Sequence, residues 1–205
     1  MIFLRWSKNR QLEEFRLRLR AERMRADWLT PEEVSAVLSS APSLPIRAAE
    51  IMFAYTGIRV SELVQMRVED LGPDALVVRR GKGGKTRRIP LTPWFWGAMR
   101  PYMEWRRSQP GTALLVHGVT RGHQPGAYTV DGLTHALEDH GARMGRHLSP
   151  HTFRRSFGRH LYLSGMPLPE IQRLYGHSRP EITLRYIGIT DDDLSSSMTK
   201  FQPRY

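Results

Sequence analysis

The chain contains no cysteine, and this absence excludes several kinds of chemistry at once. Without thiols there is no disulfide, no thiolate metal site and no cysteine nucleophile. A long apolar run is missing as well: residues 1–6 are too short an apolar stretch for a signal peptide, and no segment approaches the ~20 apolar residues of a membrane span. We therefore expect a cytoplasmic protein without a membrane partner.

Acidic residues are few in comparison with basic ones. Lysine and arginine together number 31 against 20 aspartates and glutamates, the formal net charge is +11, and the sequence pI is near 10.6. Arginine far outnumbers lysine, which favours bidentate recognition of phosphate over diffuse attraction. This composition suits a polyanionic partner, but a basic surface can also serve solubility alone, so the motifs must decide.

Charged and capping residues divide the chain into three segments. Residues 1–27 are rich in arginine, with apolar residues at helical spacing, and predict a basic helix that is either a DNA-contacting arm or linker, or a helix packed on the main domain. A capping pattern from Thr30 to Glu33 begins a new helix, which places the main domain at residues 28–190. Residues 191–205 start with three aspartates, which suit the N-terminus of a tail helix.

The main domain alternates helix caps with apolar helical stretches and contains one hairpin pattern. Residues 75–79 and 86–91 flank a glycine-rich turn, which predicts a β-hairpin with Lys82 at its tip. A short third strand is expected within 113–117. The predicted fold class is α+β, mainly helical, with one small antiparallel sheet.

Polar groups in the C-terminal third suit chemistry on a phosphodiester. His151 and Arg154 are three residues apart at the start of a predicted helix, where they share a face beside the positive helix end. His177 lies in the turn before a further helix, which carries Tyr186. A tyrosine hydroxyl can attack a phosphate held by arginine and histidine, whereas each fragment taken alone is more often a solvated face, a solvated turn or a core tyrosine.

The sequence argues against two other kinds of site, a nucleotide-binding loop and a metal-dependent nuclease site. The turn before Thr86 imitates the end of a nucleotide-binding loop, but Arg79 occupies the position of a required glycine, and a strand rather than a helix follows. His147 and His151 are four residues apart, as metal ligands on a helix can be, but Pro150 interrupts that helix. We expect no metal and no cofactor.

Taken together, these groups resemble the signature of the tyrosine site-specific recombinases, the phage integrase and Xer family. The matching elements span roughly residues 28–190 and are, in order, the sequence TGIRVSEL from Thr56 to Leu63, the hairpin around Lys82, PHTFR from Pro150 to Arg154, LYGHS from Leu174 to Ser178, and Tyr186. The resemblance implies a tyrosine-recombinase catalytic-domain fold. It also implies site-specific DNA recombination, in integration, excision, inversion or resolution.

The resemblance further implies a role for each of five polar groups. Tyr186 would attack the scissile phosphate, forming a 3′-phosphotyrosyl bond and freeing a 5′-hydroxyl. Arg59 and Arg154 would hold the non-bridging oxygens, on which charge grows during attack. His151 would accept the phenol proton, and His177 would bond a phosphate oxygen or share that role.

Other basic and acidic groups receive supporting roles from the same resemblance. Lys82 would protonate the departing 5′-oxygen, and Glu62 would orient the basic groups. Further candidate contacts to DNA are Lys85, Arg87 and Arg155. Because the ester keeps the energy of the backbone bond, rejoining would need no ATP.

The family also suggests how the chain assembles. Double-stranded DNA is the expected partner, with four protomers on two duplexes and a monomer or weak oligomer without DNA. The tail helix within 191–205 would contact a neighbouring protomer.

The chain departs from the family pattern in places. Relatives usually carry an additional N-terminal helical domain, so the chain is either a catalytic fragment or similar to compact recombinases that lack that domain. Gly188 and Arg155 stand where many relatives have histidine, but neither position carries a reacting group.

Two alternative functions stay open at the level of sequence. A type IB topoisomerase uses similar chemistry but religates the same strand. A DNA-binding protein of the same fold would lack the reaction altogether, although all six expected reacting groups are present here.

Overall fold

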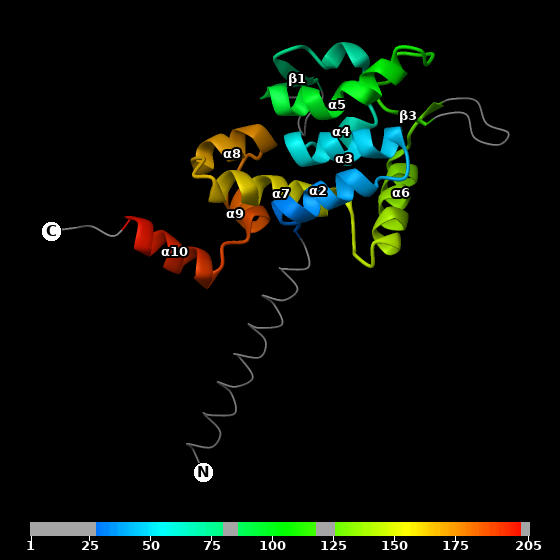
Figure 1. Cartoon of the computed structure of the whole chain (residues 1–205). Helices are drawn as coiled ribbons and strands as arrows, with labels where there is room; N and C mark the ends of the chain where they lie inside the picture. Colours follow the sequence, from blue (N-terminus) through cyan, green and yellow to red (C-terminus); the bar gives the residue numbers. More distant parts are fainter. Residues whose placement is uncertain (1–27, 80–85, 118–125, 202–205) are drawn as a thin grey trace.

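The computed structural model describes residues 28–79, 86–117 and 126–201 (Figure 1). The predicted arm within 1–27 and the hairpin lysines Lys82 and Lys85 lie outside these residues. The helices in the described ranges are α2 (Pro31–Ser40), α3 (Leu44–Thr56), α4 (Val60–Leu63), the 3-10 helix η1 (Val68–Asp70), α5 (Pro93–Arg106), α6 (Val130–Arg143), α7 (Pro150–Leu163), α8 (Leu168–Tyr175), α9 (Pro180–Ile187) and α10 (Asp191–Phe201). None of them is long and apolar enough to cross a membrane.

The predicted class, mainly helical with small antiparallel sheet, is confirmed, but the described residues form two small sheets instead of one. Strands β1 (Ala75–Val78) and β2 (Arg87–Pro90) pair antiparallel, with Leu76 opposite Ile89. The expected third strand does not join this hairpin. It is reduced to β3 (Val116–His117), which pairs with β4 (Gly126–Ala127).

The side chain of Tyr102 explains why the third strand is so short. Its hydroxyl donates to the carbonyl of Leu114 at 3.0 Å and accepts from the amide of Val116 at 3.1 Å. These backbone groups are therefore satisfied by a side chain instead of a neighbouring strand. Burial raises the pKa of Tyr102 to about 12, so the hydroxyl keeps the proton that it donates.

Local capping decides where the helices begin. The capping box predicted at the start of α2 is present, because Thr30 Oγ1 accepts from the amide of Glu33 at 3.2 Å and Glu33 Oε2 accepts from the amide of Thr30 at 2.7 Å. Single side-chain caps, without the return bond, start other helices at Ser43, Thr92, Thr129 and Ser149. The last of these caps fixes the start of α7, the helix that carries His151 and Arg154.

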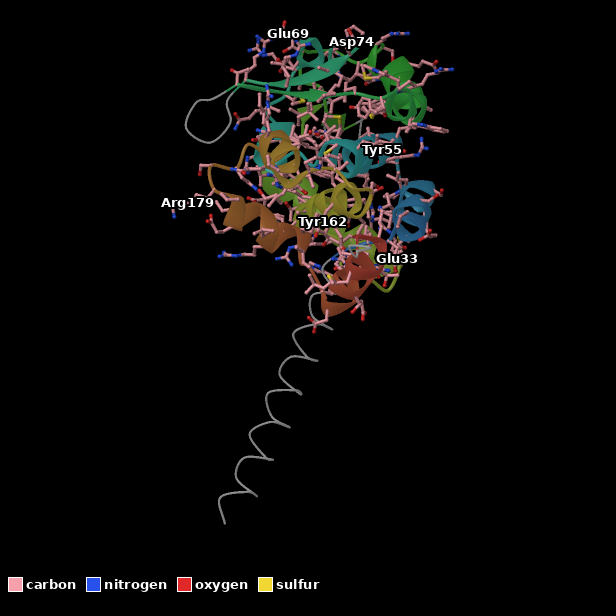
Figure 2. All side chains as sticks on the ribbon, turned by 90° about the vertical axis from the view of Figure 1, so that its left-hand side faces the viewer. Glu33, Tyr55, Glu69, Asp74, Tyr162 and Arg179 are labelled. Carbon is pink, nitrogen blue, oxygen red and sulfur yellow. The ribbon has the colours of Figure 1, made fainter. Side chains whose placement is uncertain are left out.

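Two apolar clusters hold the helices together. The larger one is built around α3, which packs against α5 and α7, and it includes Phe53 stacked on Phe153. The smaller cluster joins α7, α8 and α9 through buried Phe157, Ile171 and Ile187. Figure 1 shows α5 and β1 at the top of the molecule and α10 at the lower left, with α3 and α8 between them. The side-chain view places Glu69 and Asp74 at the hairpin end, and Tyr162 and Arg179 in the helical half (Figure 2).

Gly158 lets α7 and α8 approach closely. A Cβ added at Gly158 would lie 2.2 Å from the hydroxyl oxygen of Tyr175, which is itself fully buried. That hydroxyl donates to the carbonyl of Arg154, one turn earlier in α7. A side chain at position 158 would therefore push Tyr175 away from the helix against which the site is built.

We predict that Gly158→Ala destabilises the protein by about 1–3 kcal/mol through overpacking. Alanine in a helix interior otherwise gains up to ~1 kcal/mol over glycine. Gly97 in α5 is the matched control, because a Cβ there has nothing within 4 Å, so Gly97→Ala should raise the free energy of unfolding. Urea unfolding measures the free energy of unfolding of both variants. An equal increase for the two substitutions would show that Tyr175 moves aside without loss of stability.

Candidate active site

Gly57 and Arg59 form a tight junction between α3 and α4. Gly57 caps α3 with a left-handed backbone, φ 57°, and a Cβ there would lie 2.4 Å from Cδ1 of Phe157, so only glycine fits. Two residues on, Arg59 is the N-cap of α4, and its side chain is 29% exposed. Its Nη1 donates to Glu62 Oε1 at 3.1 Å, while its Nε and Nη2 bond to no other described residue. Arg59 thus keeps donors for an anion.

Glu62 is the acidic centre of the site. Its carboxylate accepts two bonds from Arg87 at 2.7 Å each, one from Arg59 Nη1 and one from the Arg59 amide at 3.0 Å. Burial alone would raise the pKa of Glu62, but the hydrogen bonds and charges of the two arginines outweigh it and lower that pKa to about 2. Glu62 is therefore ionised and hydrogen-bonds both guanidiniums.

Arg87 lies inside this network instead of on the DNA-facing surface for which it was predicted. Its side chain is 11% exposed, and besides Glu62 it donates from Nε to the carbonyl of Leu174 at 3.0 Å. It also fills the space beside Gly176, where a Cβ would lie 3.1 Å from Arg87 Cδ. The next residue, Arg88, is exposed. We therefore correct the expectation for Arg87: it ties β2 to α4 and to the end of α8.

Arg154 is the most deeply buried cation of the site, with 1% of its surface exposed. Its Nη1 donates to the carbonyl of Gly57, and its Nη2 donates to the carbonyl of Tyr175 at 3.1 Å. Its guanidinium carbon lies 4.2 Å from the ring centroid of Tyr175 and 5.5 Å from that of Tyr186. Burial first, then the charge of Arg59, lowers the pKa of Arg154 to about 10, so it stays cationic at neutral pH.

His177 is held in one tautomer between Arg154 and Thr183. Arg154 Nη2 lies 3.1 Å from His177 Nε2, and a guanidinium can only donate, so Nε2 accepts. Nδ1 then carries the proton and donates to Thr183 Oγ1 at 2.9 Å. Burial, followed by the charges of Arg154, Arg59 and Arg87, lowers the pKa of His177 to about 4. This histidine is neutral at physiological pH.

Thr183 is a site residue that the motifs did not identify. It is completely buried on α9, three residues before Tyr186 and thus on the same side of that helix. Its hydroxyl accepts from Nδ1 of His177 and so satisfies the tautomer that Arg154 imposes at Nε2. The helical spacing from Tyr186 was the available signal in the sequence.

Tyr186 and His151 meet at the open side of the site. The hydroxyl of Tyr186 lies 3.2 Å from His151 Nδ1, and the Tyr186 ring lies 5.4 Å from the ring of His177. Burial, followed by the charges of Arg154, Arg155 and Arg59, lowers the pKa of His151. A neutral imidazole within hydrogen-bond reach of a phenol can accept its proton.

The structure thus brings together five of the six predicted reacting groups from distant parts of the chain. They are Arg59 before α4, His151 and Arg154 on α7, His177 in the turn after α8, and Tyr186 on α9. Lys82 lies outside the described residues, as does Lys85. Arg155 is half-buried beside these groups on α7. Clustered cations, a neutral base and a phenol make a site for nucleophilic attack on an anionic ester.

Comparison with known proteins identifies the family of the chain. The family model described as the phage integrase family matches residues 27–192, most of the chain. The chain belongs to the phage integrase family. A curated relative, the tyrosine recombinase XerA of Thermococcus kodakarensis, is 33% identical over 178 residues, covering 84% of this chain and 61% of the relative.

Solved structures of integrase family members share the fold. A crystal structure of XerA recombinase matches with a TM-score of 0.75 at 25% identity, covering 87% of this chain and 66% of that one. The pre-cleavage complex of XerH with its difH substrate matches with a TM-score of 0.62 at 22% identity, covering 87% and 55%. The chain spans about three fifths of the length of the curated relatives that it matches.

We predict that Glu62→Gln destabilises the integrase fold in a pH-dependent way. In the folded protein Glu62 stays charged down to about pH 2, but it protonates near its ordinary 4.5 when unfolded. The stabilisation, on the order of 3 kcal/mol, is therefore complete above pH 4.5 and is lost as the pH falls toward 2.

Urea unfolding from pH 7 down to pH 3 measures this difference. The gap between wild type and Glu62→Gln should be largest near neutral pH and should narrow below pH 4.5. Glu69→Gln is the control, because the Glu69 side chain is 62% exposed and its ion pairs are long, so its effect should be small at every pH. A gap that widens in acid would contradict the assignment.

Proposed function

We propose that the chain is the catalytic domain of a site-specific DNA recombinase that cuts and rejoins DNA through a 3′-phosphotyrosyl intermediate. The contact between the Tyr186 hydroxyl and His151 Nδ1, at 3.2 Å, carries this proposal, because it pairs a nucleophile with a neutral base next to the buried Arg154. Membership of the phage integrase family and the XerA relative support it.

The proposed reaction is a phosphoryl transfer from the 5′-oxygen of DNA to the tyrosine hydroxyl. Tyr186 Oη attacks the scissile phosphorus as its proton passes to His151, so a P–O bond to tyrosine forms and the bond from phosphorus to the 5′-oxygen breaks. Lys82 supplies a proton to that 5′-oxygen. Charge that grows on the non-bridging oxygens is met by Arg59, whose Nε and Nη2 bond no described residue, and by Arg154.

Rejoining reverses these steps and requires neither a metal nor ATP in this proposal. The ester to Tyr186 conserves the energy of the broken bond, so a 5′-hydroxyl from a second duplex can attack it. Fixed arginine charges take the part that a metal ion plays in other phosphoryl-transfer enzymes. His177 is neutral in the free site. The negative charge of a bound phosphate would favour protonation of its Nε2, and that N–H can donate to a phosphate oxygen.

Double-stranded DNA is the proposed substrate, and the assembly is four protomers on two duplexes. The net charge of +11 supports a polyanionic partner, and the structural relative XerH has been solved with its difH substrate. Lys85 and Arg155 are proposed as DNA contacts. α10 is proposed to contact a neighbouring protomer, since its Leu194 and Met198 are 55% and 64% exposed. Action in the cytoplasm follows from such a substrate.

We predict that the chain forms a covalent adduct with nicked DNA. The substrate is a pool of short duplexes with randomised sequence and one nick. Cleavage close to the nick releases a short 5′-hydroxyl fragment that diffuses away, so the cleaved strand cannot be rejoined and stays attached to the protein. Adducts that survive denaturing detergent, also in EDTA, are recovered and sequenced.

Variants at two tyrosines assign the nucleophile. Tyr186→Phe should abolish the adduct, whereas Tyr162→Phe on α7 should leave it intact. Failure of the wild-type chain to trap any duplex, or an adduct that persists in Tyr186→Phe, would refute the proposed function. Relaxation of a supercoiled plasmid without the selected site would instead indicate a topoisomerase.

A modified leaving group tests the proposed role of Lys82. Lys82→Ala should slow adduct formation about 100-fold on ordinary DNA, within the usual range for a general acid. A duplex whose scissile 5′-oxygen is replaced by sulfur should restore the rate, because a thiol with a pKa of about 8.5 leaves without protonation. An equal defect on both duplexes would remove Lys82 from this role.

A further inference from the structure

Arg159 on α7 is a buried cation that the proposed chemistry does not use. It is 5% exposed and lies five residues after Arg154. Its guanidinium meets three separate pieces of chain: the end of α9, the start of α10 and Trp28, where the described chain begins. Because one side chain contacts all three segments, a movement of one segment also displaces the others.

The contacts with α9 concern the helix that carries the nucleophile. Arg159 Nη1 donates to the carbonyl of Gly188 at 2.7 Å and to that of Ile187 at 3.2 Å. Ile187 directly follows Tyr186, and Gly188 ends the helix with a left-handed backbone, φ 61°. Since α9 has only two turns, its own hydrogen bonds alone leave its C-terminal end weakly fixed. Arg159 supplies donors to the carbonyls that such an end leaves free.

The contacts with α10 form a buried ion pair. Arg159 Nη2 donates to both carboxylate oxygens of Asp193 at 3.0 Å, and the two side chains are 6% and 10% exposed. Asp193 also accepts from the amide and hydroxyl of Thr190 at 2.7 and 2.8 Å, which caps α10. Burial would raise the pKa of Asp193, but these hydrogen bonds and the charge of Arg159 lower it.

The third contact is with Trp28. The guanidinium carbon of Arg159 lies 4.5 Å from the ring centroid of Trp28, a cation–π distance. The next residue is fixed to the same helix, because the amide of Leu29 donates to Ser156 Oγ at 2.7 Å and His160 Nε2 donates to the Leu29 carbonyl at 2.8 Å. Arg159 therefore connects Trp28 with the end of α9, the helix that carries Tyr186.

We propose that Arg159 is a positioning residue for Tyr186, which sets the distance of its hydroxyl from the scissile phosphate through the carbonyls of Ile187 and Gly188. This inference rests on the proposed recombinase function. A nucleophile must come within about 3 Å of its target, and a shift of about 1 Å costs on the order of 100-fold in rate. A guanidinium reaches the two carbonyls and Asp193 together because its donors form a planar fork, and a lysine ammonium lacks that geometry.

The test uses Arg159→Lys in the full chain with the duplex recovered as a covalent adduct. We expect the single-turnover rate of adduct formation at saturating DNA to fall 10- to 100-fold, with the dissociation constant for DNA unchanged within about twofold. Arg106→Lys is the matched control: Arg106 is also buried, 3% exposed, and holds the carbonyls of Gln109, Gly111 and Ala113 at the far end of α5. It should lower the melting temperature without changing the rate.

The sulfur leaving group separates positioning from proton transfer. The defect of Arg159→Lys should persist on that duplex, whereas the defect of Lys82→Ala disappears. Asp193→Asn, which keeps the carbonyl contacts, should slow the reaction less than Arg159→Lys and covers the case in which the latter folds poorly. The inference would be overturned if Arg159→Lys and Asp193→Asn both formed the adduct as fast as Arg106→Lys. It would also be overturned if weaker DNA binding accounted for their slower adduct formation. An inactive wild-type chain would instead refute the recombinase function.

Discussion

The buried guanidinium of Arg154 is the interaction on which the rest of the site depends. An unpaired charge at this depth would cost several kcal/mol, so the carbonyls of Gly57 and Tyr175 must lie where they can accept its protons. These carbonyls belong to the end of α3 and the end of α8, whereas Arg154 belongs to α7. One side chain thereby holds three helices at fixed separations, and His177 lies against it.

Charge balance around Arg154 explains the state of the two histidines. Arg59, Arg87 and Arg154 surround a single carboxylate, that of Glu62. Burial, followed by the excess positive charge, disfavours imidazolium and lowers the pKa of both His151 and His177, which keeps them neutral. In the proposed function a phosphodiester would supply the missing negative charge. The charges that would meet it are already in place in the free site, which would avoid reorganisation during the proposed reaction.

Local sequence signals predicted the elements but not all of their pairings. The capping box at Thr30 needs only neighbouring residues, and it is present. The hairpin strands were also predictable, because alternation and a glycine-rich turn are local. Alternation cannot tell which of Arg87 and Arg88 faces the interior, since both readings fit a strand of period two. Only the packing of β2 beside α4 and α8 turns Arg87 toward Glu62.

The sequence by itself determined the family and the mainly helical fold, because the family's polar groups occur as short motifs in a fixed order; the roles of those groups stay predictions. Tertiary structure alone decided how the groups are supported. Thr183 accepts a hydrogen bond from His177, and Arg159 joins the end of α9 to α10, through contacts that no motif contains. The physical reason is that burial makes these bonds obligatory, and burial depends on which helices pack together, so it emerges only from the whole fold.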